Sequence, residues 1–362
     1  MADAELAGAV KTALAQVEIP GGGTLAAYGG LSDIIVTKSA IAFAISVQAG
    51  MEAAFGPARE AAQKAAAAVA DGRKVMVSLT ADKAPPQAAT GQAAAQGRPG
   101  PAPRSPVPGV RNIIVVGSGK GGVGKSTVST NLALAFAAEG LKTGILDADL
   151  YGPSIPKLLG IEGKPAIRED GIFAPHTAFG LSAMSIGSML TPGQAVVWRG
   201  PMATSALRQL LRETHWGDLD LLVVDLPPGT GDIQISLFQQ AELAGAVIVS
   251  TPQDLALIDA QKAVDMMRRL SIPLLGLVEN MSYFITPDTG VRYDIFGHGG
   301  AQTAAARMDM PFLGEVPLDM AIRETSDAGR PVMAANPDGP QAAAFRAIAR
   351  EILSRNPQLR GA

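Results

Sequence analysis

The sequence predicts an α/β protein: a doubly wound, mainly parallel sheet, preceded by a small α+β domain on a linker rich in proline and alanine. From Arg111 onward, short runs of Val, Ile and Leu alternate with helical stretches, and each run is followed by a glycine or an acidic residue. Such runs are typical of strands that are buried on both faces of a parallel sheet. Before them, a segment with many prolines separates a shorter stretch that has its own apolar pattern.

The chain has 362 residues, of which 47% are hydrophobic and 17% charged, and this length fits two compact domains. Its net charge of -3 argues against a nucleic-acid partner, since phosphate-binding surfaces carry an excess of Lys and Arg. The acidic N-terminus differs from a signal peptide, and no apolar run approaches the roughly 18 residues that cross a bilayer. We therefore expect a cytoplasmic protein with no membrane partner.

The sequence contains no cysteine. This excludes disulfides, thiolate nucleophiles, Cys-ligated zinc and conventional cysteine-held iron–sulfur clusters built from this chain alone. The three histidines, His176, His215 and His298, lie far apart in sequence and form no ligand pair.

Residues 1–81 predict the small α+β domain. Apolar residues at helical spacing indicate an opening helix, and an Ala-rich stretch at 57–70 predicts a second one. Three apolar runs predict its strands: 31–36, 40–47 and 74–79. Residues 82–109 follow as a flexible linker, because they offer almost no large apolar side chain to bury.

Residues 110–362 predict the main domain. Seven apolar runs predict its strands: 113–116, 143–146, 181–186, 221–224, 246–249, 274–278 and 312–316. In a doubly wound sheet, ligands bind outside the carboxyl ends of the strands. We therefore expect the functional residues directly after these runs.

A glycine-rich motif follows the first of these strands. Residues 117–127 satisfy the phosphate-binding pattern G-x-x-x-x-G-K-[ST] between a strand and a helix. The pattern predicts a nucleotide site in which backbone N–H groups converge on phosphate oxygens, Lys125 neutralises the β and γ end, and Ser126 ligates Mg²⁺. The predicted binding residues are Gly119, Lys120, Gly121, Gly122, Val123, Gly124, Lys125, Ser126 and Thr127. A glycine-rich turn that only resembles the motif is the alternative.

Lys120 is a second lysine in this loop, which an ordinary phosphate-binding loop does not require. With it, the loop resembles the deviant Walker A motif K-G-G-x-G-K-[ST] of the MinD/ParA and nitrogenase-iron-protein class of ATPases. In that class the extra lysine reaches the nucleotide of a partner subunit, so the resemblance implies a catalytic role for Lys120 in an ATP-binding homodimer. The alternative is a solvated lysine on the loop.

Two carboxylates end the second strand of the main domain. Asp147 and Asp149 stand one residue apart, which predicts that one of them faces the nucleotide crevice. The resemblance implies that Asp149 is the catalytic switch I aspartate, which positions or deprotonates the attacking water, and that Asp147 supports it at the nucleotide. A helix N-cap is the alternative for either residue.

Two further strand ends carry candidate site residues. Asp225 follows the fourth strand, as expected for the Walker B aspartate in the Mg²⁺ shell. Gly229 lies in the segment that follows, whose glycines free backbone N–H groups and predict a switch II loop that senses γ-phosphate. Asn280 ends a later strand, and its amide offers a donor and an acceptor that match the adenine edge. An Asx-turn is the alternative for Asn280.

Together the motifs resemble the Mrp/ApbC family of iron–sulfur cluster carrier ATPases, over about residues 108–355. The segments that carry the resemblance are 117–127, 147–154, 198–202, 225–232, 279–284, 295–300 and 314–319. The resemblance implies a homodimer that binds ATP and Mg²⁺, hydrolyses ATP slowly and delivers iron–sulfur clusters to apoproteins, with those clients or iron–sulfur assembly factors as partners. It also likens residues 1–81 to a small iron–sulfur assembly domain, in degenerate form.

The chain departs from this family at the cluster ligands. Members typically carry Cys-x-x-Cys shortly after Glu-Asn-Met-Ser, and two such pairs in a dimer supply four thiolates to a bridging [4Fe–4S] cluster. Here Thr286 and Thr289 stand at the two positions. A neutral hydroxyl does not replace a soft thiolate on iron. The resemblance therefore implies a cluster for which this chain lacks ligands, so we expect either transfer through a partner that holds the cluster or loss of the carrier step.

A second hypothesis is a MinD/ParA-like positioning switch, in which an ATP-dependent dimer binds a membrane, DNA or a partner protein. The Trp-Arg-Gly-Pro-Met segment and the Pro-Pro-Gly-Thr-Gly-Asp segment argue against it. The C-terminal stretch around Phe345, Ile348 and Ile352 has a short apolar face without Trp, so we expect it to pack in the core rather than on a membrane.

Overall fold

The structure is a computed structural model that describes residues 3–20, 22–32, 34–36, 40–48, 51–82, 105–150, 152–189 and 200–361. The chain divides into two compact units, Met1–Gln96 and Gly97–Ala362, and each has its own sheet and core. Most of the predicted linker lies outside the described residues. Its last part belongs to the C-terminal unit, where Val107 is buried and Arg212 donates hydrogen bonds to the carbonyls of Ser105 and Pro106.

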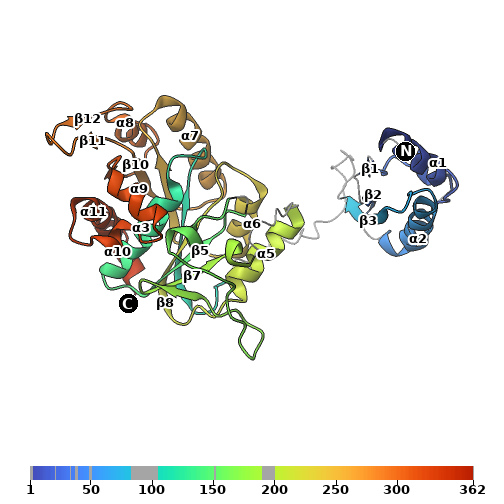
Figure 1. Ribbon diagram of the computed structural model, residues 1–362, viewed down its shortest axis with the longest axis horizontal. Helices are drawn as coiled ribbons and strands as arrows, with labels where there is room; N and C mark the ends of the chain where they lie inside the picture. The colour runs from blue at the N-terminus through green and yellow to red at the C-terminus, as the bar shows by residue number, and fades with distance from the viewer. Residues whose placement is uncertain are drawn as a thin grey trace, which may run out of the picture. The chain divides into compact units, whose positions relative to one another are not determined.

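The N-terminal unit packs two helices on a three-stranded sheet (Figure 1). Its elements are α1 (Asp3–Leu14), η1 (Leu25–Ala27), β1 (Ile35–Val36), β2 (Ala40–Gln48), α2 (Glu52–Ala68) and β3 (Lys74–Asp82). The strand order is β1-β2-β3, with β1 antiparallel and β3 parallel to β2. Apolar side chains of both helices, among them Leu6, Val10 and Ala62, are buried against Ile41 and Ile45 of β2. A small α+β unit is therefore present, as the sequence predicts.

Two elements of this unit differ from the prediction. Within the run 31–36, the strand β1 covers Ile35–Val36, and Leu31 makes only an isolated antiparallel bridge with Ile45, next to which the side chain of Ser32 accepts the N–H of Ala44. Helix α2 begins at Glu52 rather than at Pro57. A helix that began at Pro57 would hold the proline in its first turn, where its missing N–H costs nothing. Here the helix continues around it with one backbone hydrogen bond fewer.

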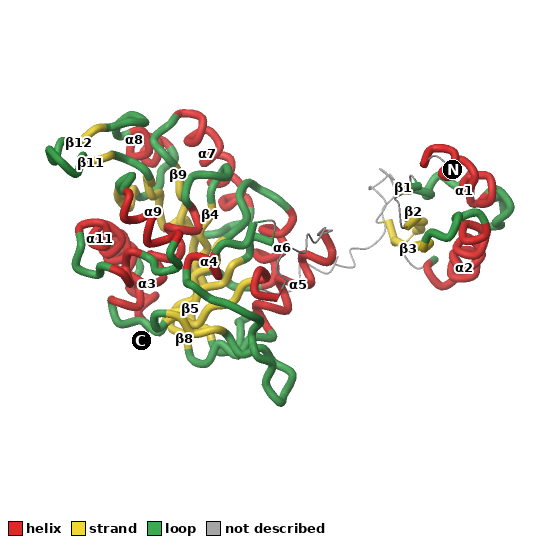
Figure 2. The backbone as a smooth tube through the Cα atoms, viewed as in Figure 1, coloured by secondary structure: helices red, strands yellow, loops and turns green. Residues whose placement is uncertain are grey.

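An eight-stranded sheet forms the centre of the C-terminal unit (Figure 2), in the order β13-β10-β9-β4-β8-β5-β7-β6. The strands are β4 (Val110–Gly117), β5 (Thr143–Asp147), β6 (His176–Ala178), β7 (Leu181–Ser185), β8 (Leu219–Asp225), β9 (Gly245–Ser250), β10 (Leu274–Asn280) and β13 (Phe312–Val316). All neighbouring pairs are parallel except β6 with β7. All seven predicted strands are confirmed, and the short edge strand β6 is added to them.

Helices cover both faces of this sheet (Figure 1). One face carries α3 (Lys125–Ala138), α10 (Val332–Ala335) and α11 (Pro340–Arg355), and the other carries α5 (Gly200–Arg212), α6 (Asp232–Gln240), α7 (Asp254–Arg269) and α8 (Gly300–Arg307). The remaining elements are α4 (Ile155–Leu158), α9 (Met320–Asp327), η2 (Ile186–Met189), η3 (Pro357–Arg360) and the hairpin of β11 (Phe284–Ile285) and β12 (Arg292–Tyr293).

Successive residues of a strand enter opposite layers of the core. In β8, Val223 packs in the layer of α3 and α11, while Leu222 and Val224 pack in the layer of α5 and α6. Burying such a side chain contributes about 1.5–3 kcal/mol. This is why continuous apolar runs predict the strands, and it confirms the doubly wound class. Phe345, Ile348 and Ile352 are buried in the same way, so α11 is a core-packing helix.

Candidate functional site

A pocket of about 260 Å³ lies at the carboxyl edge of the sheet, where the glycine-rich loop joins β4 to α3. Strand β4 lies between β8 and β9, so this edge is where the winding of the sheet reverses, the usual ligand position in such folds. The lining residues are Ser118, Lys120, Gly121, Gly122, Val123, Gly124, Lys125, Ser126, Thr127, Asp149, Ser154, Leu158 and Pro228. The structure therefore brings the predicted loop and the predicted switch I aspartate together.

Two glycines of the loop are required by close packing. A Cβ added at Gly119 would lie 2.0 Å from the carbonyl carbon of Asp259 in α7, so only glycine fits there. Gly124 has a left-handed backbone, with φ of 77°, and a Cβ there would lie 2.2 Å from Nδ2 of Asn280. The loop is thus held against α7 on one side and against the end of β10 on the other.

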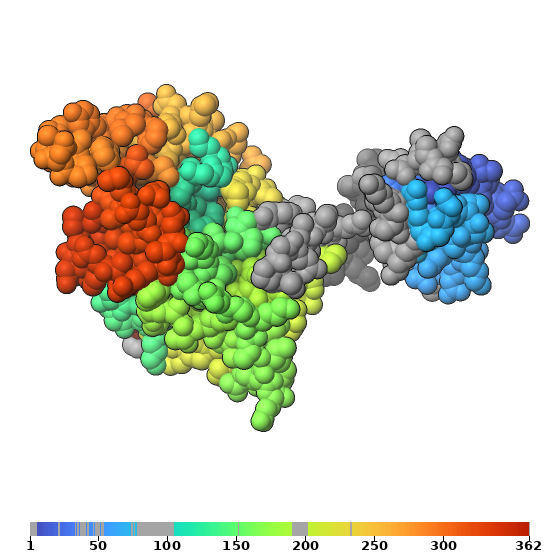
Figure 3. Space-filling view, in the orientation of Figure 1, coloured from blue at the N-terminus to red at the C-terminus, as the bar shows by residue number. Residues whose placement is uncertain are grey.

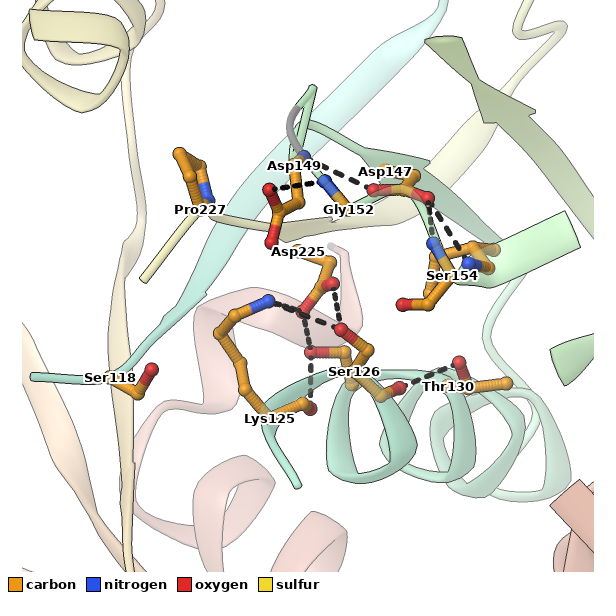
Figure 4. Close-up of polar contacts among 12 residues, drawn as sticks. Ser118, Lys125, Ser126, Thr130, Asp147, Asp149, Gly152, Ser154, Asp225 and Pro227 are labelled. Carbon is orange, nitrogen blue, oxygen red and sulfur yellow. Dashed lines mark hydrogen bonds and ion pairs between the residues drawn. The ribbon is translucent and has the colours of Figure 1, made fainter. Parts of the chain in front are cut away.

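The floor of the pocket is built around Asp225, which is completely buried (Figure 4). The ammonium of Lys125 lies 2.8 Å from Oδ1 of Asp225. The hydroxyl of Ser126 donates to Oδ2 at 2.5 Å, and that of Ser129 donates to Oδ1 at 2.6 Å. A buried carboxylate is tolerated only when it is paired and hydrogen-bonded, and Asp225 is both. The Walker A lysine, its serine and the Walker B aspartate therefore form one cluster.

Asp147 accepts hydrogen bonds mainly from backbone N–H groups of this chain. It lies at the end of β5 beside Asp225, with which it is in register. One carboxylate oxygen accepts the N–H of Asp149, and the other accepts the N–H groups of Ser154 and Ile155 and the hydroxyl of Ser185. Asp147 therefore caps the start of α4 and supports the loop that carries Asp149.

The surroundings of Asp147 also change its acidity. Burial, and after it the charge of Asp225, raises the pKa of Asp147 to about 7, although hydrogen bonds from Ile155, Ser185 and Asp149 oppose this. The carboxylate of Asp149 itself lines the pocket and accepts the N–H of Gly152 at 3.2 Å. Asp149 is the carboxylate of this pair that lines the pocket.

Two predicted binding residues contact the loop itself. Nδ2 of Asn280 donates to the carbonyl of Val123 at 2.8 Å, and the N–H of Gly229 donates to the carbonyl of Ser118 at 3.0 Å. Neither residue is among those that line the pocket. An adenine contact for Asn280 and a γ-phosphate contact for Gly229 stay predictions, and both residues act structurally on the loop.

The two threonines at the expected cysteine positions lie side by side in the turn of the β11–β12 hairpin. Their hydroxyl oxygens are hydrogen-bonded to each other, and that of Thr286 also accepts the N–H of Val291. Within the described part of the chain, no group of three or more His, Asp or Glu side chains is placed to hold a metal ion. His298 is exposed and contacts the guanidinium of Arg292 through Nδ1.

Several residues of the site are not marked by any motif in the sequence. Ser129 lies one helical turn after Lys125, so its spacing could have placed it at Asp225. Ser185 ends β7, the neighbour of β5, and strand order was needed to bring it to Asp147. Gln234 of α6 is buried and donates to the carbonyl of Pro227, which fixes the start of the predicted switch II segment. Tyr151, like the Trp-Arg pair of the segment 198–202, lies outside the described residues.

Residues 109–353 match the family model of the ParA class that is described as NUBPL iron-transfer P-loop NTPase. The chain belongs to this family. The iron–sulfur cluster carrier protein of Deinococcus radiodurans is 52% identical over 247 residues, which are 68% of this chain and 70% of that protein. The iron–sulfur cluster transfer protein NUBPL of Mus musculus is 48% identical over 254 residues, 70% of this chain and 80% of that protein. The family inferred from the motifs is confirmed.

Two solved structures share the fold of the C-terminal unit. A nucleotide-binding protein from Archaeoglobus fulgidus in complex with ADP is 40% identical, with a TM-score of 0.57 over 65% of this chain and 92% of that chain. The cell division ATPase MinD of Pyrococcus furiosus is 25% identical, with a TM-score of 0.52 over 67% of this chain and 99% of that chain. In the part of this chain that the structure describes, no helix is long and apolar enough to cross a membrane. A cytoplasmic location stays a prediction.

The Lys125–Asp225 pair leads to a first prediction. Lys125→Ala should lower the free energy of unfolding by about 3–5 kcal/mol, because it leaves a buried carboxylate without its counter-charge. The double variant Lys125→Ala/Asp225→Asn should cost at least about 1 kcal/mol less than the sum of the two single variants. Urea denaturation followed by Trp fluorescence measures this. Lys142→Ala, which breaks an exposed pair with Asp218, is the control and should cost under about 1 kcal/mol. If the losses of unfolding free energy in the two single variants simply added up in the double variant, the pairing of Lys125 with Asp225 would be contradicted.

A second prediction concerns pH. Because the pKa of Asp147 is raised from 3.8 to about 7 by folding, the folded chain binds this proton more tightly than the unfolded chain. The contribution of Asp147 to the free energy of unfolding should therefore fall as pH rises between about 4 and 7, by at most about 1.4 kcal/mol per pH unit. The free energy of unfolding of the wild type minus that of Asp147→Asn, measured by denaturation at several pH values, should decrease over this range. A constant difference would refute the shift.

Proposed function

We propose that this chain binds MgATP and hydrolyses it slowly as a homodimer, and that its nucleotide cycle assists the delivery of iron–sulfur clusters to apoproteins. The observation that carries the proposal is the cluster of Lys125, Ser126 and Asp225 at the floor of a pocket that Asp149 also lines. Membership of an iron-transfer P-loop NTPase family supports the proposal that iron–sulfur clusters are what is delivered.

Phosphate binding follows from the loop and α3. Backbone N–H groups between Gly119 and Gly124 and the N-terminus of α3 favour the phosphate oxygens of ATP, and Lys125 adds a full positive charge. Asn280 would contact the adenine, and Thr127 would add its hydroxyl to the phosphates. Gly229 would exchange its hydrogen bond to Ser118 for one to the γ-phosphate, which links the phosphate to the switch II segment.

The oxygen donors at the pocket floor suit Mg²⁺. Ser126 Oγ and Asp225 Oδ2 lie 2.5 Å apart, and hydroxyl and carboxylate oxygens are ligands that this hard cation prefers. Ser126 would hold the ion directly and Asp225 through water. When bound, Mg²⁺ supplies positive charge at the β- and γ-phosphate oxygens.

The hydrolytic step depends on Asp149 and Lys120. Asp149, at the pocket edge and 9% exposed, would orient the attacking water and accept its proton. Lys120 lines the same pocket, and its ammonium has no ion-pair partner among the described residues. An unpaired ammonium at the pocket rim is suited to stabilise the negative charge that develops on the nucleotide of a partner subunit.

Cluster ligation is not assigned to this chain. The donors at the hairpin are two neutral hydroxyls that already bond to each other, and they do not suit iron that is normally held by thiolates. We propose instead that a partner protein holds the cluster while this chain contributes nucleotide-dependent changes of shape.

Lys120→Ala tests the homodimer. Binding of a fluorescent ATP analogue should stay close to that of the wild type, while turnover should fall by on the order of 10³-fold, the scale of a lost trans-acting charge. Lys164→Ala, at an exposed lysine away from the pocket, is the control and should leave both unchanged.

Mixing two inactive variants makes this test sharper. In a heterodimer of Lys120→Ala with Lys125→Ala, the first subunit binds ATP and the second supplies Lys120, so mixing should restore part of the turnover. If mixtures remain as inactive as the separate variants, Lys120 does not act across an interface.

The hairpin gives a further prediction. After anaerobic incubation with iron and sulfide, the wild type should retain no stoichiometric cluster, while Thr286→Cys/Thr289→Cys should retain about four iron atoms per dimer, as four thiolates allow. Metal analysis and absorption spectra measure this. Thr286→Ser/Thr289→Ser keeps the hydroxyls and should bind none. A stoichiometric cluster on the wild type would overturn the ligand argument.

A further inference from the structure

Strand β10 ends with two polar side chains that face opposite sides of the sheet. Val278 packs in the core layer of α3, and Leu277 packs in that of α7 and α8. Because side chains alternate along a strand, Asn280 follows Val278 toward the glycine-rich loop and Glu279 follows Leu277 toward α8. Of these two adjacent residues, Asn280 thus contacts the glycine-rich loop and Glu279 contacts the opposite layer.

Glu279 contacts both residues that flank the segment 283–300. Its carboxylate is completely buried; Oε1 accepts the hydroxyl of Ser282 at 2.6 Å, and Oε2 accepts the N–H of Ala301, in the first turn of α8, at 2.8 Å. Among the described residues, no cation pairs with it. Residues 283–300, which we call the hairpin lobe, lie between these two contacts. One carboxylate therefore clamps both ends of the lobe that carries the threonine pair.

Contacts of Arg292 hold the rest of the lobe together. The guanidinium of Arg292 lies 4.1 Å from the ring centre of Tyr283 and pairs with Asp294 within the lobe at 2.9 Å and with Glu315 of β13 at 3.3 Å. In Figure 3 the orange part of the chain that includes the lobe projects from one end of the C-terminal unit. A movement of its base would therefore move the threonine turn as well.

Asn280 connects this base to the pocket. Its amide donates to the carbonyl of Val123, and Gly124, the next residue, has no room for a Cβ against the same amide. Met281, between Asn280 and Ser282, has a left-handed backbone with φ of 54°, a conformation that long side chains rarely adopt and that surrounding contacts must hold. A shift of the loop at Val123 would thus move Asn280, and with it the neighbouring Glu279 at the end of the same strand.

We propose that Asn280 and Glu279 are positioning residues that couple the nucleotide loop to the hairpin lobe, so that bound nucleotide sets the position of the threonine turn. The inference rests on the proposed binding of MgATP. It goes beyond that function because it gives the path by which the pocket reaches the lobe.

Hydrogen–deuterium exchange of lobe peptides tests the coupling, with and without a non-hydrolysable ATP analogue and Mg²⁺. In the wild type, nucleotide should change the exchange of amides in 283–300. In Glu279→Gln, which keeps the volume but loses the charge, the nucleotide-induced change should fall by half or more while the affinity for the analogue stays the same. Ser282→Ala removes only one of the two contacts, keeps the buried carboxylate on α8, and should also reduce the change.

Glu315→Gln is the matched control. It makes the same chemical change on the strand beside Glu279 and removes one of the two ion pairs of Arg292, but its side chain takes no part in the hydrogen bonds of Glu279 and Asn280. Lobe exchange should become faster in this variant, and its response to nucleotide should remain. The coupling would be overturned if bound nucleotide left the exchange of the wild-type lobe unchanged. It would also be overturned if nucleotide changed lobe exchange in Glu279→Gln and Ser282→Ala as much as in the wild type. A wild type that binds no nucleotide would overturn the proposed function instead.

Discussion

The ammonium of Lys125 and the carboxylate of Asp225 face each other over 2.8 Å in a region that water hardly reaches. Either charge buried alone would cost several kcal/mol, so the loop, α3 and β8 are held in one mutual arrangement. The same carboxylate fixes the hydroxyls of Ser126 and Ser129. The contacts of Lys125 and Ser126 with Asp225 therefore preorganise this part of the loop before any phosphate binds.

Three carboxylates at the ends of parallel strands have different roles because they face different partners. Asp225 faces a lysine and hydroxyls, which suits a cation site. Asp147 faces backbone N–H groups at the start of α4, which makes it a support for the Asp149 loop. Glu279 faces the start of α8 and Ser282, which makes it a clamp for the hairpin lobe. The shared strand-end position brings all three to one edge of the sheet.

The sequence predicts the parts of this structure that depend on local pattern. Buried strands carry continuous apolar runs, and the phosphate loop has a fixed spacing, so both are found where they are expected. Contacts that depend on the order of strands are not visible in the sequence. The sequence predicts an adenine contact for Asn280, which stays a prediction, and it does not reveal the contact of Asn280 with Val123, 157 residues away along the chain. The capping role of Asp147 is an alternative that the sequence offers, but the helix that it caps becomes known only from the position of α4.

The residues that line the nucleotide pocket are different from the two threonines of the hairpin. None of the contacts among Lys125, Ser126 and Asp225 involves the hairpin, so nucleotide turnover should not need iron. The most direct test is phosphate release from ATP by chelator-treated, iron-free protein, with Mg²⁺ present or absent. We expect slow turnover that requires Mg²⁺ and is lost in Lys125→Ala. No turnover in the iron-free wild type, or equal release by Lys125→Ala, would contradict it.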